Sequence, residues 1–544
     1  MLNKKDSLAL IDIGSNSVRL CIYKGNMRSP DILYNKKFFC GLGQYKLGTS
    51  EITKDAEKKC INSIIFFNSI LEEIKTNHQV ALCTAAIRNA SNKKDVVSNI
   101  SKVFKGKIKI LKGDEEAELS ALGVLSAIPE AHGVMIDMGG GSIELASIKK
   151  TKIDKVKSFP VGILNFEIKK NEISDFEKEL KLSHRNEEIF YLIGGTFRTI
   201  ARCFIHLNNL PLNEIHQLRI SKEKFEGLEK RLLRLNNEEL SKVPKVSPDR
   251  VEHIHIALKI IKLIFITTNC VELIYPRYGI REGFIYNNLS KKHRIQDPTK
   301  ISLDFIAKNK CRFLIFNDKS FSWVERKYLK FKNKKISLEQ KRIIELSFKI
   351  SDLGWEQNSK TRAQFAFSSI LSYPLIGIGY SEKILIAYIV YLRHCKEILD
   401  QKKCDQKIEK VLSFLNSDER KFGYEYGCII HFLYTYTRGS SASLKFLNLD
   451  EAQVRIIAPD VGGGFGYKTL IHPEELSVAW LAMKFRKPFR WIEDRREHLI
   501  SGANSRQHSY HLKAYADDTG RLLALDAEVT IDGGAYSNWP FTIG

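Results

Sequence analysis

Asp12-Ile-Gly-Ser-Asn-Ser17 ends one apolar run, and Asp137-Met-Gly-Gly-Gly-Ser142 ends another. Each segment is typical of a buried strand that finishes in a carboxylate and a tight glycine turn, with a second strand behind it over 18–23 or 143–148. Glycine lets the backbone approach a ligand closely, and successive turn N–H groups form a nest that binds anions. A single glycine hairpin usually only joins strands. Two with the same Asp-x-Gly-x-x-Ser chemistry predict a phosphate clamp built from two related halves.

Alternating strand and helix patterns surround both turns. The alternation predicts an α/β architecture in which a ligand lies between two sheets. From about residue 300 to 446 the apolar spacing changes to a mostly helical pattern. Among these elements we predict strands over 80–84, 107–111 and 191–193, and helices over 56–75, 197–204, 338–353 and 384–395.

The formal net charge of +23 is confined to residues 1–450, because residues 451–544 hold 11 Lys and Arg against 12 Asp and Glu. A basic region of this size is expected to bind an anion such as a nucleic acid, an anionic membrane or a polyphosphate. A lysine-rich solvated surface has the same composition. Net charge alone does not choose among these readings.

Ten cysteines are scattered between Cys21 and Cys428 without a Cys-x-x-Cys pair. This spacing predicts free thiols in a reducing compartment and no disulfide framework or zinc site. The first six residues lead directly into the first predicted strand, so no signal peptide is expected. The most apolar stretch, 384–392, is too short to cross a bilayer, and the uncharged run 364–381 is broken by Pro374. These features predict a cytoplasmic protein without a membrane segment.

Six segments together resemble the exopolyphosphatase and guanosine pentaphosphate phosphohydrolase (Ppx/GppA) family. In chain order they are Asp12-Ile-Gly-Ser-Asn-Ser-Val-Arg19, Thr84-Ala-Ala-Ile-Arg88, Gly113-Asp-Glu-Glu-Ala117, Asp137-Met-Gly-Gly-Gly-Ser-Ile-Glu144, Gly194-Gly-Thr196 and Gly279-Ile-Arg-Glu-Gly283. The resemblance covers roughly residues 7–446. It implies a duplicated actin-like, ribonuclease-H-like fold with a cleft between the two domains, followed by a helical domain. The domains we expect are 1–121 and 122–296 (actin-like), 297–446 (helical) and a truncated α+β tail over 450–544.

Hydrolysis of a phosphoanhydride requires neutralised charge, an in-line water and a group that orients or deprotonates that water. Glu116 is the candidate general base, since the resemblance implies this role for the Glu directly before Ala117. Glu115 is expected to point elsewhere, because adjacent helix positions diverge by about 100°. The alternative is that residues 114–118 are only an acidic first helical turn favoured by the helix dipole.

The two turns provide the other candidates. Asp12, Asp137 and Glu144 offer hard oxygen ligands that could hold Mg²⁺ or another divalent cation, directly or through water. Arg88 offers a planar fork suited to phosphate, and its alternative is a surface arginine at a strand end. With the hydroxyl, amide and backbone donors of the turns, the predicted substrate-binding set is Ser15, Asn16, Arg88, Gly139, Gly140 and Ser142.

The resemblance implies release of terminal orthophosphate from inorganic polyphosphate, with guanosine pentaphosphate as the alternative substrate. A non-catalytic phosphate or alarmone sensor could use the same clamps, but it would have no need of Glu116. A sugar or acetate kinase of the same fold would transfer the phosphoryl group to an acceptor other than water. We expect no nucleic-acid and no membrane partner. The helical region has only His394 and His431 and no His-Asp pair, which predicts a binding or dimerisation module and a homodimer.

Residues from about 450 resemble a different family, the large subunit of xanthine dehydrogenase, aldehyde oxidase and carbon monoxide dehydrogenase. The similar segments are Val454-Arg-Ile-Ile-Ala-Pro-Asp-Val-Gly-Gly-Gly-Phe-Gly-Tyr-Lys468, Trp491-Ile-Glu-Asp-Arg-Arg-Glu-His498 and Asp532-Gly-Gly-Ala-Tyr536. In that family the Gly-Gly-Phe-Gly turn approaches the molybdenum pterin cofactor, so Phe465 and Gly466 are the matching positions.

The tail also differs in composition, with no cysteine and three of the five tryptophans. Only about 95 residues of a far larger subunit are present. We interpret 450–544 as a partial molybdenum-hydroxylase-like fragment of a chimeric or truncated gene product, joined between Ser441 and Leu449. Molybdopterin is not expected to bind, because the other cofactor-binding segments are missing. A molybdenum hydroxylase fragment with an unrelated N-terminal partner is the remote alternative. The strand over 523–531 is expected to expose unpaired edges.

Overall fold

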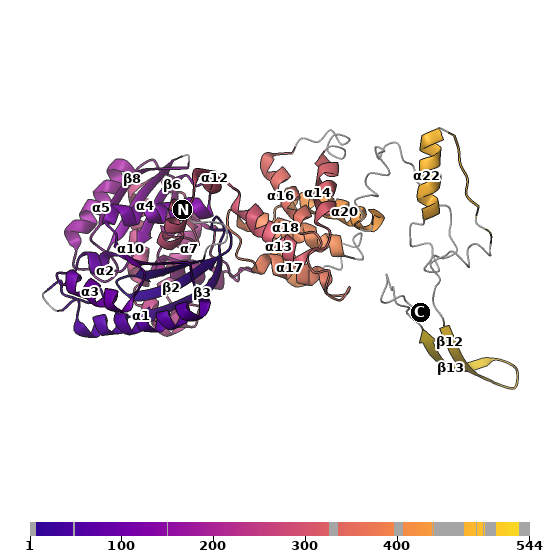
Figure 1. Cartoon of the computed structure of the whole chain (residues 1–544), viewed down its shortest axis with the longest axis horizontal. Coiled ribbons are helices and arrows are strands. Elements are labelled where there is room, and N and C mark those ends of the chain that lie inside the picture. The colour runs from indigo at the N-terminus through magenta and orange to yellow at the C-terminus, as the bar shows by residue number, and fades with distance from the viewer. Residues whose placement is uncertain are drawn as a thin grey trace. The chain divides into compact units, whose positions relative to one another are not determined.

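A computed structural model describes residues 7–46, 49–149, 151–325, 336–395, 406–437, 439, 473–485, 487–492, 494 and 508–531. The chain divides into two compact units, one formed by residues 1–321 and 336–432, the other by 322–335 and 433–544. Figure 1 shows the elements in chain order from indigo to yellow. Each unit is described by itself below.

The first sheet has five strands in the order β3-β2-β1-β4-β5. β1 pairs antiparallel with β2, which forms the first hairpin, and parallel with β4. Because β1 is central and buried on both faces, its sequence is a continuous apolar run up to Asp12. The strands are β1 Leu8–Ile13, β2 Ser17–Lys24, β3 Asp31–Phe39, β4 His78–Cys83 and β5 Lys107–Ile110, and the helices are α1 Lys54–Ile74, α2 Ala85–Arg88 and α3 Lys93–Val103.

The second sheet repeats this arrangement. Its order is β10-β11-β9-β6-β7-β8, so that β8, β7, β6, β9 and β11 correspond to the five strands of the first sheet, and β10 extends one edge. The predicted duplicated, actin-like α/β fold is therefore confirmed. The strands are β6 Gly133–Met138, β7 Ile143–Lys149, β8 Lys152–Phe159, β9 Ile189–Ile193, β10 Leu218–Ser221 and β11 Glu272–Tyr275. The helices are α5 Lys170–Ser183, α6 Gly195–Leu207, α7 Lys222–Leu232, α8 Asn237–Ser241, α9 Pro248–Val251, α10 Ile254–Thr267 and α12 Lys291–Arg294.

Two helices, α4 (Gly113–Ala127) and α11 (Ile280–Asn287), cross at a pair of glycines. A Cβ added at Gly123 would lie 2.2 Å from the carbonyl oxygen of Gly279, and one added at Gly283 would lie 1.7 Å from that of Leu119. Only glycine permits this backbone contact. The crossing fixes the N-terminal turns of both helices relative to each other, and these turns carry the functional side chains described below.

The helical region follows the second sheet. Lys383 of α18 forms a buried ion pair of 2.5 Å with Glu214, which ties α18 to the segment before β10. The predicted helices over 338–353 and 384–395 are confirmed, although the first ends at Lys349 and 350–353 form a turn. The helices are α13 Pro298–Lys310, α14 Leu314–Trp323, α16 Leu338–Lys349, α17 Arg362–Ser372, α18 Tyr380–His394, α19 Gln406–Leu412 and α20 Ser417–Thr437.

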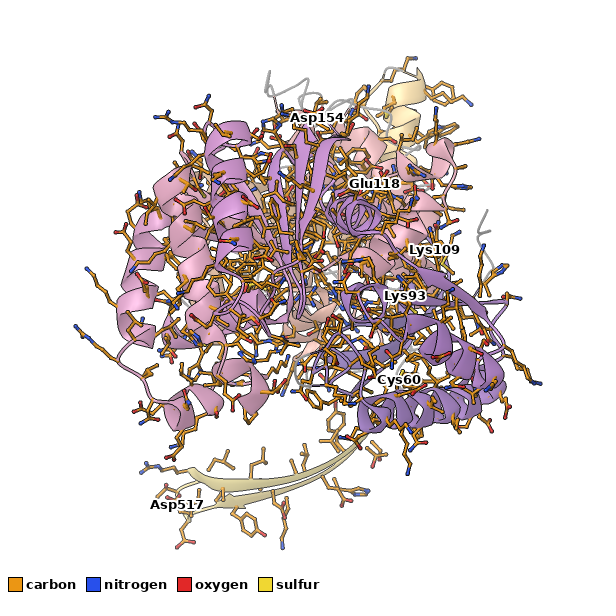
Figure 2. The ribbon with its side chains drawn as sticks, turned by 90° about the vertical axis from the view of Figure 1, so that its left-hand side faces the viewer. Cys60, Lys93, Lys109, Glu118, Asp154 and Asp517 are labelled. Carbon is orange, nitrogen blue, oxygen red and sulfur yellow. The ribbon has the colours of Figure 1, made fainter. Side chains whose placement is uncertain are left out.

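In the second unit the structure describes α22 (Pro473–Phe485) and an antiparallel pair, β12 (His508–Ala516) and β13 (Leu522–Ile531). Figure 2 labels Asp517 at the turn of this pair. β13 confirms the predicted strand over 523–531, and apolar side chains along the pair are exposed, with Leu512 at 62% and Leu525 at 59%.

Among the helices that the structure describes, none combines the length and the apolar character needed to cross a bilayer. The buried cysteines Cys21, Cys40, Cys60, Cys83, Cys203 and Cys270 are free thiols, as predicted from the spacing.

Candidate active site

The first hairpin places Asp12 opposite Arg19 in the β1–β2 register. The turn is closed by a hydrogen bond of 3.0 Å from the Gly14 N–H to the Ser17 carbonyl. A third side chain, Arg281 of α11, lies with its Nε 3.9 Å from Oδ2 of Asp12. The carboxylate of the first hairpin therefore faces two arginines.

The second hairpin places Asp137 opposite Glu144 in the β6–β7 register. Its turn has the same geometry, with the Gly139 N–H donating to the Ser142 carbonyl at 2.9 Å. Ser120 of α4 donates to Oδ2 of Asp137 at 2.7 Å, and Ser158 of β8 donates to Oε1 of Glu144 at 3.1 Å. The second hairpin thus carries two carboxylates on one face, each held by a serine.

The two turns meet. A Cβ added at Gly140 would lie 2.8 Å from Cβ of Ser15, and one added at Gly141 would lie 3.2 Å from its hydroxyl oxygen. The backbone carbonyl of the neighbouring Asn16 accepts from the N–H groups of Cys40 and Gly41. The structure therefore brings together the predicted substrate-binding residues of both turns, including Gly139 and the buried Ser142. The close contact between the turns requires glycine in the second turn.

Glu116 lies in the first turn of α4 and is buried, with 9% of its surface exposed. Its Oε2 is 2.5 Å from Nη1 of Arg88, which also donates to the Leu111 carbonyl at 3.1 Å. Its neighbour Glu115 pairs instead with Lys109 of β5. Figure 2 labels Lys109 and also Glu118, an exposed residue of α4. Only one acidic side chain of this helical turn is buried.

The carboxylates of the two hairpins and α4 influence one another. Burial raises the pKa of Glu116 to about 7, with Asp137 and Asp12 adding to the rise and Arg88 opposing it. Burial, together with the negative charges of Glu116 and Asp137, raises the pKa of Glu144 well above its usual range. A carboxylate with a pKa near neutrality in a buried polar site is typical of a general base.

The donor set of the second hairpin fits a divalent cation. Mg²⁺ usually binds one or two protein carboxylates and completes its octahedral shell with water and substrate phosphate oxygens. Asp137 and Glu144 supply such a pair, and a cation would compensate their buried charge. In the described part of the chain no three acidic, thiol or imidazole groups converge as a complete ligand set. Phosphate and water oxygens would therefore have to complete the shell.

Three charged residues of the site were not assigned roles from the sequence. Arg281 and Glu282 lie in the quoted Gly279–Gly283 segment, and Arg198 follows the Gly194-Gly-Thr196 turn by two residues. Burial lowers the pKa of Arg198 to about 10, although the nearby carboxylates Glu282 and Asp137 favour its charged form. Glu282 accepts a hydrogen bond of 2.5 Å from the hydroxyl of Tyr23 and one of 3.1 Å from the Gly279 N–H. The sequence feature that could have identified these three residues is their position inside or beside the segments that carry the family resemblance.

The predicted molybdopterin positions Phe465 and Gly466 lie outside the described residues.

The model of the Ppx/GppA phosphatase family matches residues 21–292, which is half of the chain. The chain belongs to the Ppx/GppA phosphatase family. The matched range contains five of the six quoted segments, and the first, which ends at Arg19, lies just before it. The model of a molybdopterin cofactor-binding domain matches residues 435–543.

Curated relatives match either part separately. Exopolyphosphatase 1 of Mycobacterium leprae is 29% identical over 160 residues, which are 28% of this chain and 47% of that protein. The nicotine 6-hydroxylase large subunit of Paenarthrobacter nicotinovorans is 36% identical over 98 residues, which are 18% of this chain and 12% of that protein. The chain thus spans less than half the length of these relatives.

Among solved structures, an exopolyphosphatase from Cytophaga hutchinsonii is similar with a TM-score of 0.47 and 24% identity, covering 52% of this chain and 97% of that one. A Ppx/GppA protein from Aquifex aeolicus is similar with a TM-score of 0.46 and 24% identity, covering 52% and 99%.

Proposed function

We propose that this protein is an exopolyphosphatase, a phosphoric anhydride hydrolase that releases terminal orthophosphate from inorganic polyphosphate. The observation that carries the proposal is the meeting of two anion-binding turns beside a buried carboxylate, Glu116, whose pKa lies near 7. Family membership supports the reaction class. The relatives' names support polyphosphate ahead of guanosine pentaphosphate as the substrate.

Glu116 is the proposed general base. At neutral pH a substantial fraction of it is ionised, and Oε1 is left for water because Oε2 is engaged by Arg88. The carboxylate accepts a proton from the water as its oxygen attacks the terminal phosphorus, and the bond from that phosphorus to the bridging oxygen breaks. The products are orthophosphate and a polyphosphate shorter by one unit.

The turns bind the terminal phosphoryl group. The backbone N–H of Gly140 and the hydroxyls of Ser15 and Ser142 are the proposed donors, and Asn16 offers its amide. Gly139 contributes by closing the turn through its bond to the Ser142 carbonyl. Arg88 is placed to share its guanidinium between Glu116 and a phosphate oxygen. These contacts hold the phosphorus in line with the water.

Asp137 and Glu144 are the proposed ligands of Mg²⁺ or another divalent cation. When bound there, the cation would neutralise charge on the phosphate oxygens. Asp12 was predicted to share this role. Because it faces Arg281 and Arg19, we propose that the affinity for the cation depends little on Asp12. A cytoplasmic location and a homodimer formed through the helical region stay predictions.

The direct test is release of orthophosphate by the purified full chain. With Mg²⁺ present, we expect steady release from long-chain polyphosphate at a higher kcat/KM than from guanosine pentaphosphate. Higher kcat/KM for guanosine pentaphosphate would overturn the substrate assignment. Binding of both compounds without any release would favour a phosphate sensor.

A further inference from the structure

A cavity of about 780 Å³ lies between the second sheet's outer elements and the helical region, away from the carboxylate site. Its walls come from α6, β10 and α7 on one side and from the start of α18 with Phe414 on the other. This volume falls within the range of small-molecule sites, about 300–1,000 Å³. The proposed phosphatase reaction uses none of its residues.

One part of the lining is aromatic and apolar. Phe204, Tyr380 and Phe414 contribute rings, and the centroids of Tyr380 and Phe414 are 6.4 Å apart. The hydroxyl of Tyr380 donates to the Leu212 carbonyl, and this hydrogen bond fixes the position of the Tyr380 ring. Such walls favour a flat aromatic group.

Another part of the lining is cationic. Arg219, Lys224 and Arg231 contribute three positive charges, against one acidic residue, Glu382. Arg219 is paired with Glu272 at 2.6 Å, and Glu382 is held by the Gly379 N–H at 2.6 Å. Lys224 forms no ion pair with the residues that the structure describes. A purely apolar ligand would leave this charge uncompensated, and a bare polyanion would leave the rings unused.

From this combination we infer that the cavity binds a purine nucleotide, with its base against the aromatic wall and its phosphates toward Lys224 and Arg231. The Lys383–Glu214 ion pair and the Tyr380 hydrogen bond connect the two walls, so contacts within the protein fix the shape of the cavity. Preformed sites of this mixed character are typical of small-molecule binding.

Gly227 of α7 provides a sharp test, because it lines the cavity and a Cβ added there meets no atom within 4 Å. Gly227→Trp is therefore expected to place its ring in the cavity, and Gly227→Ala, which adds only the Cβ, is its matched control. Lys224→Glu reverses the charge inside the cavity, and Lys230→Glu makes the same change on the same helix outside it.

The experiment is isothermal titration of the full chain and these four variants with ATP, GTP, adenosine, guanosine and inorganic triphosphate. EDTA is included to suppress hydrolysis. We expect ATP or GTP to bind more tightly than its nucleoside, and triphosphate binding to the active site to be unaffected by the cavity variants. Lys224→Glu should weaken nucleotide binding about ten- to hundredfold, the range for losing a charged contact. Gly227→Trp should weaken it at least as much by occupying the cavity, while the two controls bind nucleotide like the original chain.

The inference is overturned if neither nucleotide binds at millimolar concentration, if Gly227→Trp leaves nucleotide binding unchanged, or if Gly227→Trp weakens triphosphate binding as much as nucleotide binding. Preference for ATP or for GTP identifies the base. Orthophosphate release by Gly227→Trp should equal that of the original chain, so the outcome is independent of the proposed phosphatase activity.

Discussion

The hairpins β1–β2 and β6–β7 have the same turn geometry, but the charged residues beside their aspartates differ. Both end a central strand in an aspartate, and both close with a glycine N–H donating to a serine carbonyl at 3.0 and 2.9 Å. Across the first hairpin the partner of Asp12 is Arg19, and across the second the partner of Asp137 is Glu144. The two hairpins thus share the turn proposed to bind phosphate, but the residue opposite the aspartate has the opposite charge.

This difference predicts that the two hairpins differ in their need for a bound cation. The first hairpin already has cations, since Arg281 and Arg19 face Asp12 and oppose the rise that burial causes in its pKa. At Glu144 of the second hairpin, burial and the charges of Glu116 and Asp137 raise the pKa, and Arg88 opposes this rise more weakly than those charges add to it. We therefore expect the second hairpin to need a divalent cation more than the first.

The largest effect is expected at Glu116, beside the second hairpin. Glu116→Gln should retain polyphosphate binding and lower kcat by about 10²–10⁴, the usual contribution of a general base. Steady-state kinetics and polyphosphate binding measured on the same preparation check this. Full turnover in Glu116→Gln would contradict the assignment of Glu116 as the general base.

Two controls separate loss of the base from loss of structure. Glu115→Gln makes the same change one residue earlier, where the side chain pairs with Lys109, and should leave kcat unchanged. The melting temperature of Glu116→Gln should exceed that of the original chain at pH 8. The folded pKa of about 7 lies above the unfolded value near 4.5, so the ionised carboxylate costs stability once the pH rises through this window.

A smaller effect is expected at Arg88. The variant Arg88→Gln should raise KM for polyphosphate about ten- to hundredfold, because a charge-assisted contact contributes about 1.5–3 kcal/mol. In the original chain kcat should rise with pH through about 7 as Glu116 ionises. Because Arg88 lowers the pKa of Glu116, the same rise should move to higher pH in the variant. A pH profile that stays unmoved would contradict the Arg88–Glu116 coupling.

The sequence predicted the fold and much of the site because both depend on local patterns. Two turns of the same chemistry predicted the duplication, and the apolar runs before Asp12 and Asp137 placed them at the ends of central strands. The sequence could not show that Ser15 would contact Gly140, because this depends on how two domains close. Nor could it show that Arg281 would face Asp12, since this depends on tertiary contacts between α11 and the first hairpin, such as the hydrogen bond from Tyr23 to Glu282.

The smallest effect on catalysis is expected from removing the tail. β12–β13 contrasts with both hairpins of the candidate site, because its described strands pair only with each other and expose Tyr510, Leu512 and Leu525. Ending the chain after Lys445 should leave kcat unchanged and increase the soluble fraction. Lost activity would show that the tail contributes to the site. Stoichiometric molybdenum in the full purified chain would contradict the interpretation of the tail as a non-functional fragment.

The comparison of the two hairpins is tested most directly by binding of Mn²⁺, as a probe for Mg²⁺, to Glu144→Gln and Asp12→Asn. Each variant removes one carboxylate charge from one hairpin. The account predicts that Glu144→Gln binds Mn²⁺ at least about tenfold more weakly, because the affinity for the cation depends on the charge of its ligands. It predicts that Asp12→Asn binds Mn²⁺ like the original chain. Loss of affinity in Asp12→Asn with full affinity in Glu144→Gln would contradict it.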